Sequence, residues 1–182
     1  MRRRTSAILA SALIALAATR EASACKLHGA HTSTWGCDSP ARFERRYDTG
    51  AARIAITTQD GAATLLINDD VVALQLSDHT FKRIDRRFRE EEQEDDNAFG
   101  AAIKSAVFAS VRSMLDHSAA IRIREIRTVR YRDGRLEIVT TDGRHVLEDA
   151  RIDEEEDTLG SFSEHDALAF VREFDRVKGQ AR

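Results

Sequence analysis

The sequence predicts an α+β fold in which antiparallel meanders of strands are packed by a central helix and a C-terminal helix. Residues 98–117 and 163–178 place apolar side chains at helical spacing, whereas residues 52–76 and 121–152 run as short strand-like segments divided by turns. The alternative arrangement of the same elements is a partly open β-barrel capped by the last helix.

The strands before the central helix form the first predicted meander. Residues 52–58 alternate between apolar and polar side chains, and residues 63–68 and 71–76 are largely apolar. Short turns at residues 59–61 and 69–70 separate them, as expected for antiparallel neighbours.

Two further segments flank this meander. Residues 42–47 can add a preceding strand. Residues 81–88 fit either a helix or a strand, because their apolar side chains have both spacings. The acidic run 90–96 that follows lies just before the central helix, where the helix dipole favours negative charge.

Residues 98–117 are predicted to form the central helix, because their apolar side chains fall on one broad face of an ideal helix. Phe108 and Leu115 widen this face. We therefore expect the helix to be covered on more than one side and to serve as scaffold rather than as a cofactor site. The broad face consists of Phe99, Ile103, Val107, Val111 and Met114.

The second predicted meander follows the central helix. Residues 121–132 are predicted to form one long strand with a bulge near Glu125, where the alternation slips. Residues 135–140 and 144–152 form two more strands, each preceded by an Asp-Gly turn. The two meanders align loosely with each other, which leaves an internal duplication open.

Residues 163–178 are predicted to form the last helix. Ser163 and Asp166 have the spacing of a capping pair at its start, and Gly179 is expected to end it.

Residues 1–24 have the three-part pattern of a secretory signal peptide. Arginines follow the initiating methionine, residues 7–18 are apolar, and Ala-Ser-Ala precedes Cys25. The apolar run is shorter than the roughly 20 residues that span a bilayer, and no transmembrane segment is expected in the mature chain. We therefore expect export to the periplasm or beyond the cell.

The two cysteines of the chain are Cys25 and Cys37, and we expect them to form a disulfide because an exported protein meets an oxidising compartment. The alternative is a lipid anchor on Cys25, which directly follows the cleavage site. If both thiols stayed reduced, they could bind zinc or copper together with His28 and His31. The predicted parts are a signal peptide (1–24), a disulfide-closed segment (25–41) and one α+β domain (42–182).

Charge argues against one class of partner. Removal of residues 1–24, which carry four Arg and one Glu, changes the formal net charge from −3 to −6. We therefore expect no binding to nucleic acid, whose phosphates attract basic surfaces.

An acidic segment before the last helix matches the ligand offsets of an EF-hand calcium loop. Thr158 stands where such a loop needs glycine, and a strand rather than a helix is predicted before it. The sequence leaves calcium binding open, and we expect instead an acidic connection favoured by the dipole of the last helix. The offsets hold Asp153, Glu155, Asp157, the Leu159 carbonyl, Ser161 and Glu164.

The sequence shows no signature of a common catalytic site, such as G-x-S-x-G, H-E-x-x-H or a P-loop. Local sets of Ser, His and acidic residues at 77–79, 116–118 and 163–166 are expected to be turn and cap residues, since sequence neighbours point in different directions. The sequence therefore favours an exported, non-enzymatic interaction or ligand-binding protein without a cofactor, whose partner is an unknown envelope protein or small ligand. The alternative is a small exported hydrolase with a site assembled from distant residues.

Overall fold

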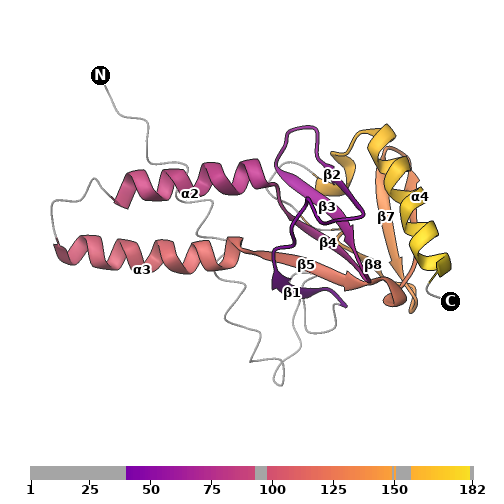
Figure 1. Cartoon of the computed structure of the whole chain (residues 1–182), viewed down its shortest axis with the longest axis horizontal. Helices are drawn as coiled ribbons and strands as arrows, with labels where there is room; N and C mark the ends of the chain where they lie inside the picture. The colour runs from indigo at the N-terminus through magenta and orange to yellow at the C-terminus, as the bar shows by residue number, and fades with distance from the viewer. Residues whose placement is uncertain (1–39, 93–97, 149, 151–156, 181–182) are drawn as a thin grey trace. The chain divides into compact units, whose positions relative to one another are not determined.

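The computed structural model describes residues 40–92, 98–148, 150 and 157–180. Within these ranges it confirms the α+β class, because helices and antiparallel sheets are both present and no barrel closes. The predicted signal peptide, and all but the last two residues of the predicted segment 25–41, lie outside them. The helices are α2 (Asp78–Glu92), α3 (Ala98–Leu115) and α4 (Glu164–Gln180) (Figure 1).

Five strands form the larger sheet, sheet A, in the order β1-β5-β4-β3-β2. Every neighbouring pair is antiparallel. β3 and β4 have the bounds predicted from the sequence, whereas β1 and β2 are shorter than predicted. The strands are β1 (Arg42–Arg45), β2 (Ile54–Thr57), β3 (Ala63–Asn68), β4 (Val71–Leu76) and β5 (His117–Arg122).

The smaller sheet, sheet B, has the order β6-β7-β8. Its strands are β6 (Ile126–Arg132), β7 (Arg135–Thr140) and β8 (His145–Val146). β7 has the predicted bounds. The Asp-Gly turn before β7 is formed by Asp133 and Gly134, whose φ angles of 51° and 82° are those of a hairpin turn that matches the strand twist.

The prediction of one long strand over residues 121–132 is wrong. A 3₁₀ turn at Ile123–Glu125 divides it, so β5 belongs to sheet A and β6 to sheet B. Ile123 and Ile126 are both buried, yet two residues three apart on a straight strand point to opposite faces. The turn brings both side chains into the core, and the register slips only between Ile126 and Thr128.

The predicted strand 144–152 is also shorter in the structure. β8 ends at Val146 because Leu147 adopts a left-handed φ of 62° while its side chain stays buried. Residues 149 and 151–152 lie outside the described ranges.

The main core lies between the inner face of sheet A, sheet B and α4. α4 contacts β6 and β2, and its buried residues recur at the spacing of one helix face. Ser163 caps this helix, because its Oγ accepts the backbone N–H of Asp166 at 3.2 Å. The helix continues through Gly179 to Gln180, beyond the predicted end. Its buried residues are Ala167, Phe170, Phe174 and Val177.

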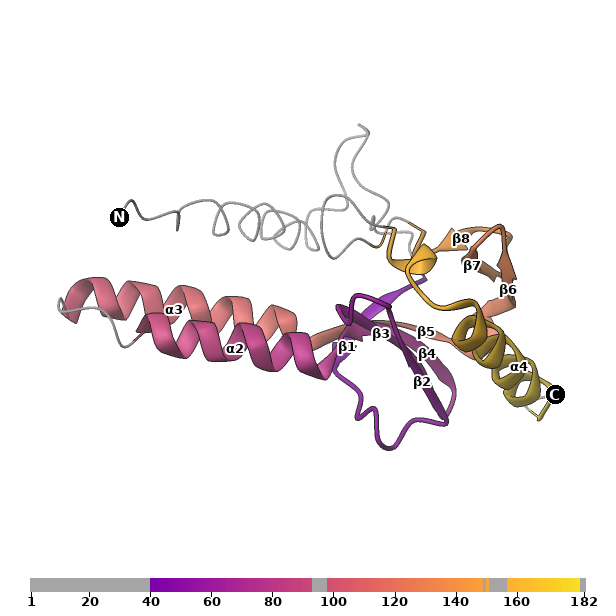
Figure 2. The same cartoon turned by 90° about the horizontal axis from the view of Figure 1, so that it is seen from above.

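α2 and α3 form a helical hairpin and lie side by side in both views (Figures 1 and 2). The ambiguous segment 81–88 is therefore helical. The rings of Phe88 and Phe108 stack with their centroids 4.7 Å apart, and Arg112 Nε lies 2.8 Å from Asp85 Oδ1. α3 was expected to pack on a sheet, whereas its larger contact is with α2 and its smaller one is with β5.

None of the helices in the described part of the chain combines the length and apolar character needed to cross a bilayer.

Candidate functional site

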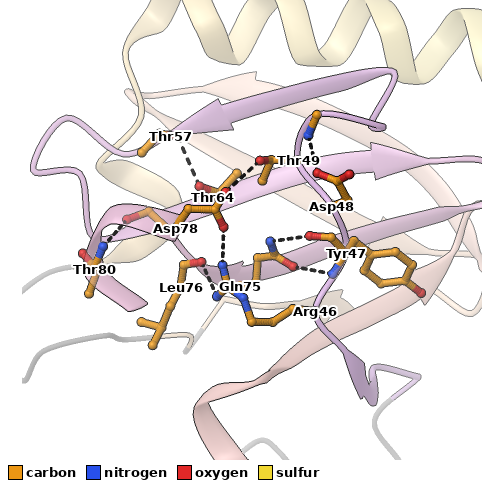
Figure 3. Close-up of polar contacts among 12 residues, drawn as sticks. Arg46, Tyr47, Asp48, Thr49, Thr57, Thr64, Gln75, Leu76, Asp78 and Thr80 are labelled. Carbon is orange, nitrogen blue, oxygen red and sulfur yellow. Dashed lines mark hydrogen bonds and ion pairs between the residues drawn. The ribbon is translucent and has the colours of Figure 1, made fainter. Parts of the chain in front are cut away.

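A polar network lies where residues 46–53 cross the outer face of sheet A (Figure 3). This is the face turned away from the main core. Beneath this segment, Leu66, Ala73 and Ala120 form a small apolar cluster on which Tyr47 and Ala52 pack. The network therefore belongs to a segment that covers one face of the sheet.

Arg46 joins this segment to the start of α2. Its side chain is only 9% exposed, and its guanidinium lies 2.6 Å from both the Leu76 carbonyl and Asp78 Oδ1. It also stacks over the ring of Phe81, 4.7 Å from the centroid. Thr49 donates to the other oxygen of Asp78 at 3.0 Å. A charge this buried is tolerated because it is paired and hydrogen-bonded.

Gln75 holds the same segment through its backbone. Its Oε1 accepts the Tyr47 N–H at 2.9 Å, and its Nε2 donates to the Tyr47 carbonyl at 3.0 Å. Gln75 is buried on β4. It is the one polar residue in the run Val-Val-Ala-Leu-Gln-Leu, and this is the sequence signal that could have identified it.

The phenol of Tyr47 has a raised pKa. Burial of its phenol, together with a 2.5 Å hydrogen bond to Glu44 Oε2, raises the pKa of Tyr47 from 10.0 to about 12. A carboxylate acceptor favours the protonated phenol. Tyr47 therefore stays neutral and acts as a hydrogen-bond donor.

The start of α2 shows that the Ser77-Asp78-His79 set is a helix cap. Ser77 Oγ accepts the N–H of Thr80 at 3.1 Å and donates to the Gly61 carbonyl. Thr80 Oγ1 donates to the same carbonyl. Asp78 binds Arg46, so none of these groups forms a nucleophile–base pair.

A small pocket of about 100 Å³ lies on β7 and β8. Its lining includes His145, Glu148 and Glu137. His145 Nδ1 lies 3.9 Å from Glu148 Oε2, and Glu137 forms an ion pair with Arg130. This volume holds a few water molecules or a small ion rather than an organic substrate.

The calcium-like set is only partly within the described ranges, because Asp153 and Glu155 lie outside them. Asp157 Oδ2 is 3.3 Å from Arg135, and its Oδ1 accepts the N–H of Leu159 at 3.1 Å. Asp157 thus caps the 3₁₀ turn Thr158–Gly160. Glu164 is the first residue of α4.

Cys25, Cys37, His28 and His31 lie outside the part of the chain that the structure describes. Among the residues it does describe, no three His, Cys, Asp or Glu side chains converge in a way that could hold a metal ion.

The exposed side of α3 is the remaining candidate surface. In the part of α3 whose side chains are described, residue 105 and residues 107–115, only Phe108 is buried. Val107 is 42% exposed, and Val111 and Met114 are half-buried. These three residues belong to the apolar face predicted from the sequence, and on an ideal helix Val107 and Met114 lie roughly 100° or more away from Phe108.

Comparisons with protein-family models, with curated proteins and with solved structures gave no match to this chain.

Proposed function

We propose that this protein is an exported, non-enzymatic interaction protein, and that it binds its partner through the side of α3 that faces away from α2. We call this side the α3 outer face and define it by Val107, Ser110 and Met114. One observation carries the proposal: this face belongs to an apolar helix, yet its described side chains are exposed or half-buried.

The composition of α3 makes that exposure informative. Lys104 and Arg112 are the two charged residues of its 18. A helix that is apolar on most sides is normally buried on most sides, but α3 packs chiefly on α2 through Phe108 and Arg112. We infer that this uncovered side of an apolar helix is where a partner packs.

Export is part of the same proposal. It is supported by the signal-like residues 1–24 and by the two cysteines just after them. We propose that the mature protein begins at Cys25, carries a Cys25–Cys37 disulfide and acts in the periplasm or outside the cell. A lipid anchor on Cys25 is the alternative.

The hydrolase alternative has weaker support. Among the described residues, the hydroxyls of Thr49 and Ser163 bind carboxylates, that of Ser77 binds a carbonyl, and that of Thr57 binds another hydroxyl rather than a histidine. A nucleophile needs such a base within hydrogen-bond reach.

A pull-down from envelope extract tests the binding surface. Val107→Glu places a charge on the α3 outer face, whereas Leu168→Glu places the same charge on α4, at a residue that is 38% exposed. We expect wild type and Leu168→Glu to retain a specific partner and Val107→Glu to lose it. Equal retention by both variants would contradict the proposal.

A further inference from the structure

We propose that the exposed basic side of α2 docks on the phosphate headgroups of an anionic lipid bilayer. We call this side the α2 outer face and define it by Lys82, Arg83, Arg86 and Arg87. It is separate from the α3 outer face, and the inference rests on the export that is part of the proposed function. Three observations carry it: the shared position of the four cations, the lack of carboxylate partners for them among the described residues, and their local charge.

The four cations lie on the side of α2 that faces away from α3. Phe88 stacks on Phe108 and Asp85 binds Arg112, so these contacts mark the side of α2 that packs on α3. On an ideal helix the four residues of the α2 outer face fall within an arc of about 140°, roughly opposite to Phe88. All four are exposed. They therefore form one continuous basic surface.

Carboxylates pair with the exposed arginines of sheet B but not with the α2 outer face. Arg130 lies 3.6 Å from Glu137, and Arg132 lies 3.3 Å from Asp133. On α2 itself, Asp85 is already bound by Arg89 and Arg112. Within the part of the chain that the structure describes, the four outer-face cations form no ion pair, so they remain available to an external anion.

Two acids lie near this surface without neutralising it. Glu90 is exposed on the same side of α2, one turn beyond Arg86. Burial raises the pKa of Asp60, but its hydrogen bonds and the nearby charge of Arg83 lower that pKa overall. Four cations minus these two carboxylates leave a local charge of +2.

This local charge can act although the mature chain is acidic. Salt screens charges beyond about 8 Å at physiological ionic strength, so distant carboxylates contribute little at the α2 outer face. Three of the four cations are arginines, whose planar guanidinium groups match the geometry of phosphate oxygens. The chemistry of this surface therefore favours phosphate groups.

The shape of the surface favours an extended array of phosphates over one small anion. The four side chains diverge from a convex helix side, so they do not converge on a single point. Long Lys and Arg side chains can nevertheless extend their charged ends to a common plane. An exported protein acts beside a membrane, and basic residues near an anionic bilayer are attracted to it. Nucleic acid also carries phosphates, but export removes the mature chain from it.

Vesicle cosedimentation of the purified mature protein, produced without a lipid on Cys25, tests the docking. Vesicles of phosphatidylcholine alone are compared with vesicles that also contain phosphatidylglycerol. We expect binding to the anionic vesicles only, and expect it to weaken as the salt concentration rises. Equal binding to both kinds of vesicle, or binding to neither, would overturn the inference.

A pair of matched variants tests the surface. Each basic residue near an anionic bilayer raises partitioning about fivefold, so Arg83→Gln with Arg86→Gln should lower binding about 30-fold. Arg130→Gln with Arg132→Gln removes the same charge from sheet B, where the two side chains are 54% and 68% exposed, and should change binding little. Equal losses in the two variants would assign binding to net charge and overturn the inference.

A gain of binding tests the same surface without removing any of its cations. Glu90→Lys changes the charge of the α2 outer face by two and should raise binding about 30-fold. Glu148→Lys makes the same change at a side chain that is 52% exposed outside α2 and is the control. Circular dichroism verifies that both variants are folded. No gain in Glu90→Lys, or an equal gain in Glu148→Lys, would contradict the inference.

The outcomes also separate this inference from the proposed function. Binding to double-stranded DNA but not to anionic vesicles would reassign the α2 outer face to nucleic acid and overturn the bilayer. A failure of vesicle binding, while the pull-down retains a partner sensitive to Val107→Glu, overturns this inference alone. Vesicle binding without such a partner keeps the α2 outer face and overturns the α3 outer face.

Discussion

At the scale of single residues, buried polar groups hold residues 46–53 on sheet A. Gln75 and Arg46 each bind backbone atoms far away in the sequence, at Tyr47 and Leu76. The sequence predicted the strand that contains Gln75, because local alternation reports strands. It did not predict the partner, because no local pattern encodes a hydrogen bond over 28 residues.

Replacing Gln75 with Ala should destabilise the protein by about 1–3 kcal/mol. The N–H and carbonyl of Tyr47 would lose the two hydrogen bonds that hold residues 46–53 on the sheet. Chemical denaturation measures the change. Gln59→Ala, at an exposed position, is the matched control and should change the free energy of unfolding little. Equal effects of the two substitutions would show that the Gln75 hydrogen bonds do not hold this segment.

Tyr47 should make stability fall at high pH. In the unfolded chain a tyrosine ionises near pH 10, whereas the folded protein keeps the Tyr47 proton until about pH 12. Since the folded pKa is the higher one, its contribution is fully present below pH 10 and is lost as the pH rises to about 12. Denaturation at several pH values in this window should show a smaller decline for Tyr47→Phe than for wild type. An identical decline in the two proteins would argue against a buried, hydrogen-bonded phenol.

At the scale of elements, the sequence located most helices and strands but not always their neighbours. The central helix was predicted at 98–117 and is found at Ala98–Leu115. Its apolar pattern was interpreted as packing on a sheet, whereas its larger contact is with α2, because a helix packs on a sheet or on another helix through the same spacing. The sequence showed a slip in alternation near Glu125, which was interpreted as a bulge within one strand. The structure has a 3₁₀ turn at Ile123–Glu125 and a change of sheet there, and both features interrupt alternation in the same way.

The connection before α4 should behave as a capped turn and not as a calcium site. Asp157 caps Leu159 and pairs with Arg135, so a cation would have to displace an arginine from this carboxylate. We expect Asp157→Ala to lower the free energy of unfolding by about 1 kcal/mol, and millimolar calcium to leave the melting temperature of the wild type unchanged. A calcium-dependent rise in melting temperature that Asp157→Ala abolishes would instead establish the site.

At the scale of the whole molecule, the α+β class and both meanders were predictable because each strand and turn has a local signature. The strand order was not. β5 joins sheet A between β1 and β4, after the entire α2–α3 hairpin has been inserted, and such a pairing depends on contacts that sequence alternation does not report. The two meanders, β2–β4 and β6–β8, lie in different sheets of the same compact unit, and the internal duplication stays a prediction.

The exported protein should begin at Cys25, without lipid and with Cys25 bonded to Cys37. Intact mass spectrometry of protein recovered from the envelope or medium measures the start of the chain. Alkylation before and after reduction reports the thiols, which should react only after reduction. A diacylglyceryl mass increment would instead show that Cys25 carries a lipid. Alkylation of the unreduced native protein would exclude the disulfide.

The central claim is that α3 packs on α2 through Phe108 and presents its opposite side to a partner. Hydroxyl-radical footprinting of the purified mature protein in dilute solution tests this packing most directly. We expect Val107 and Met114 to be oxidised and Phe108 to be protected. Strong oxidation of Phe108, or protection of Val107 and Met114, would contradict the account.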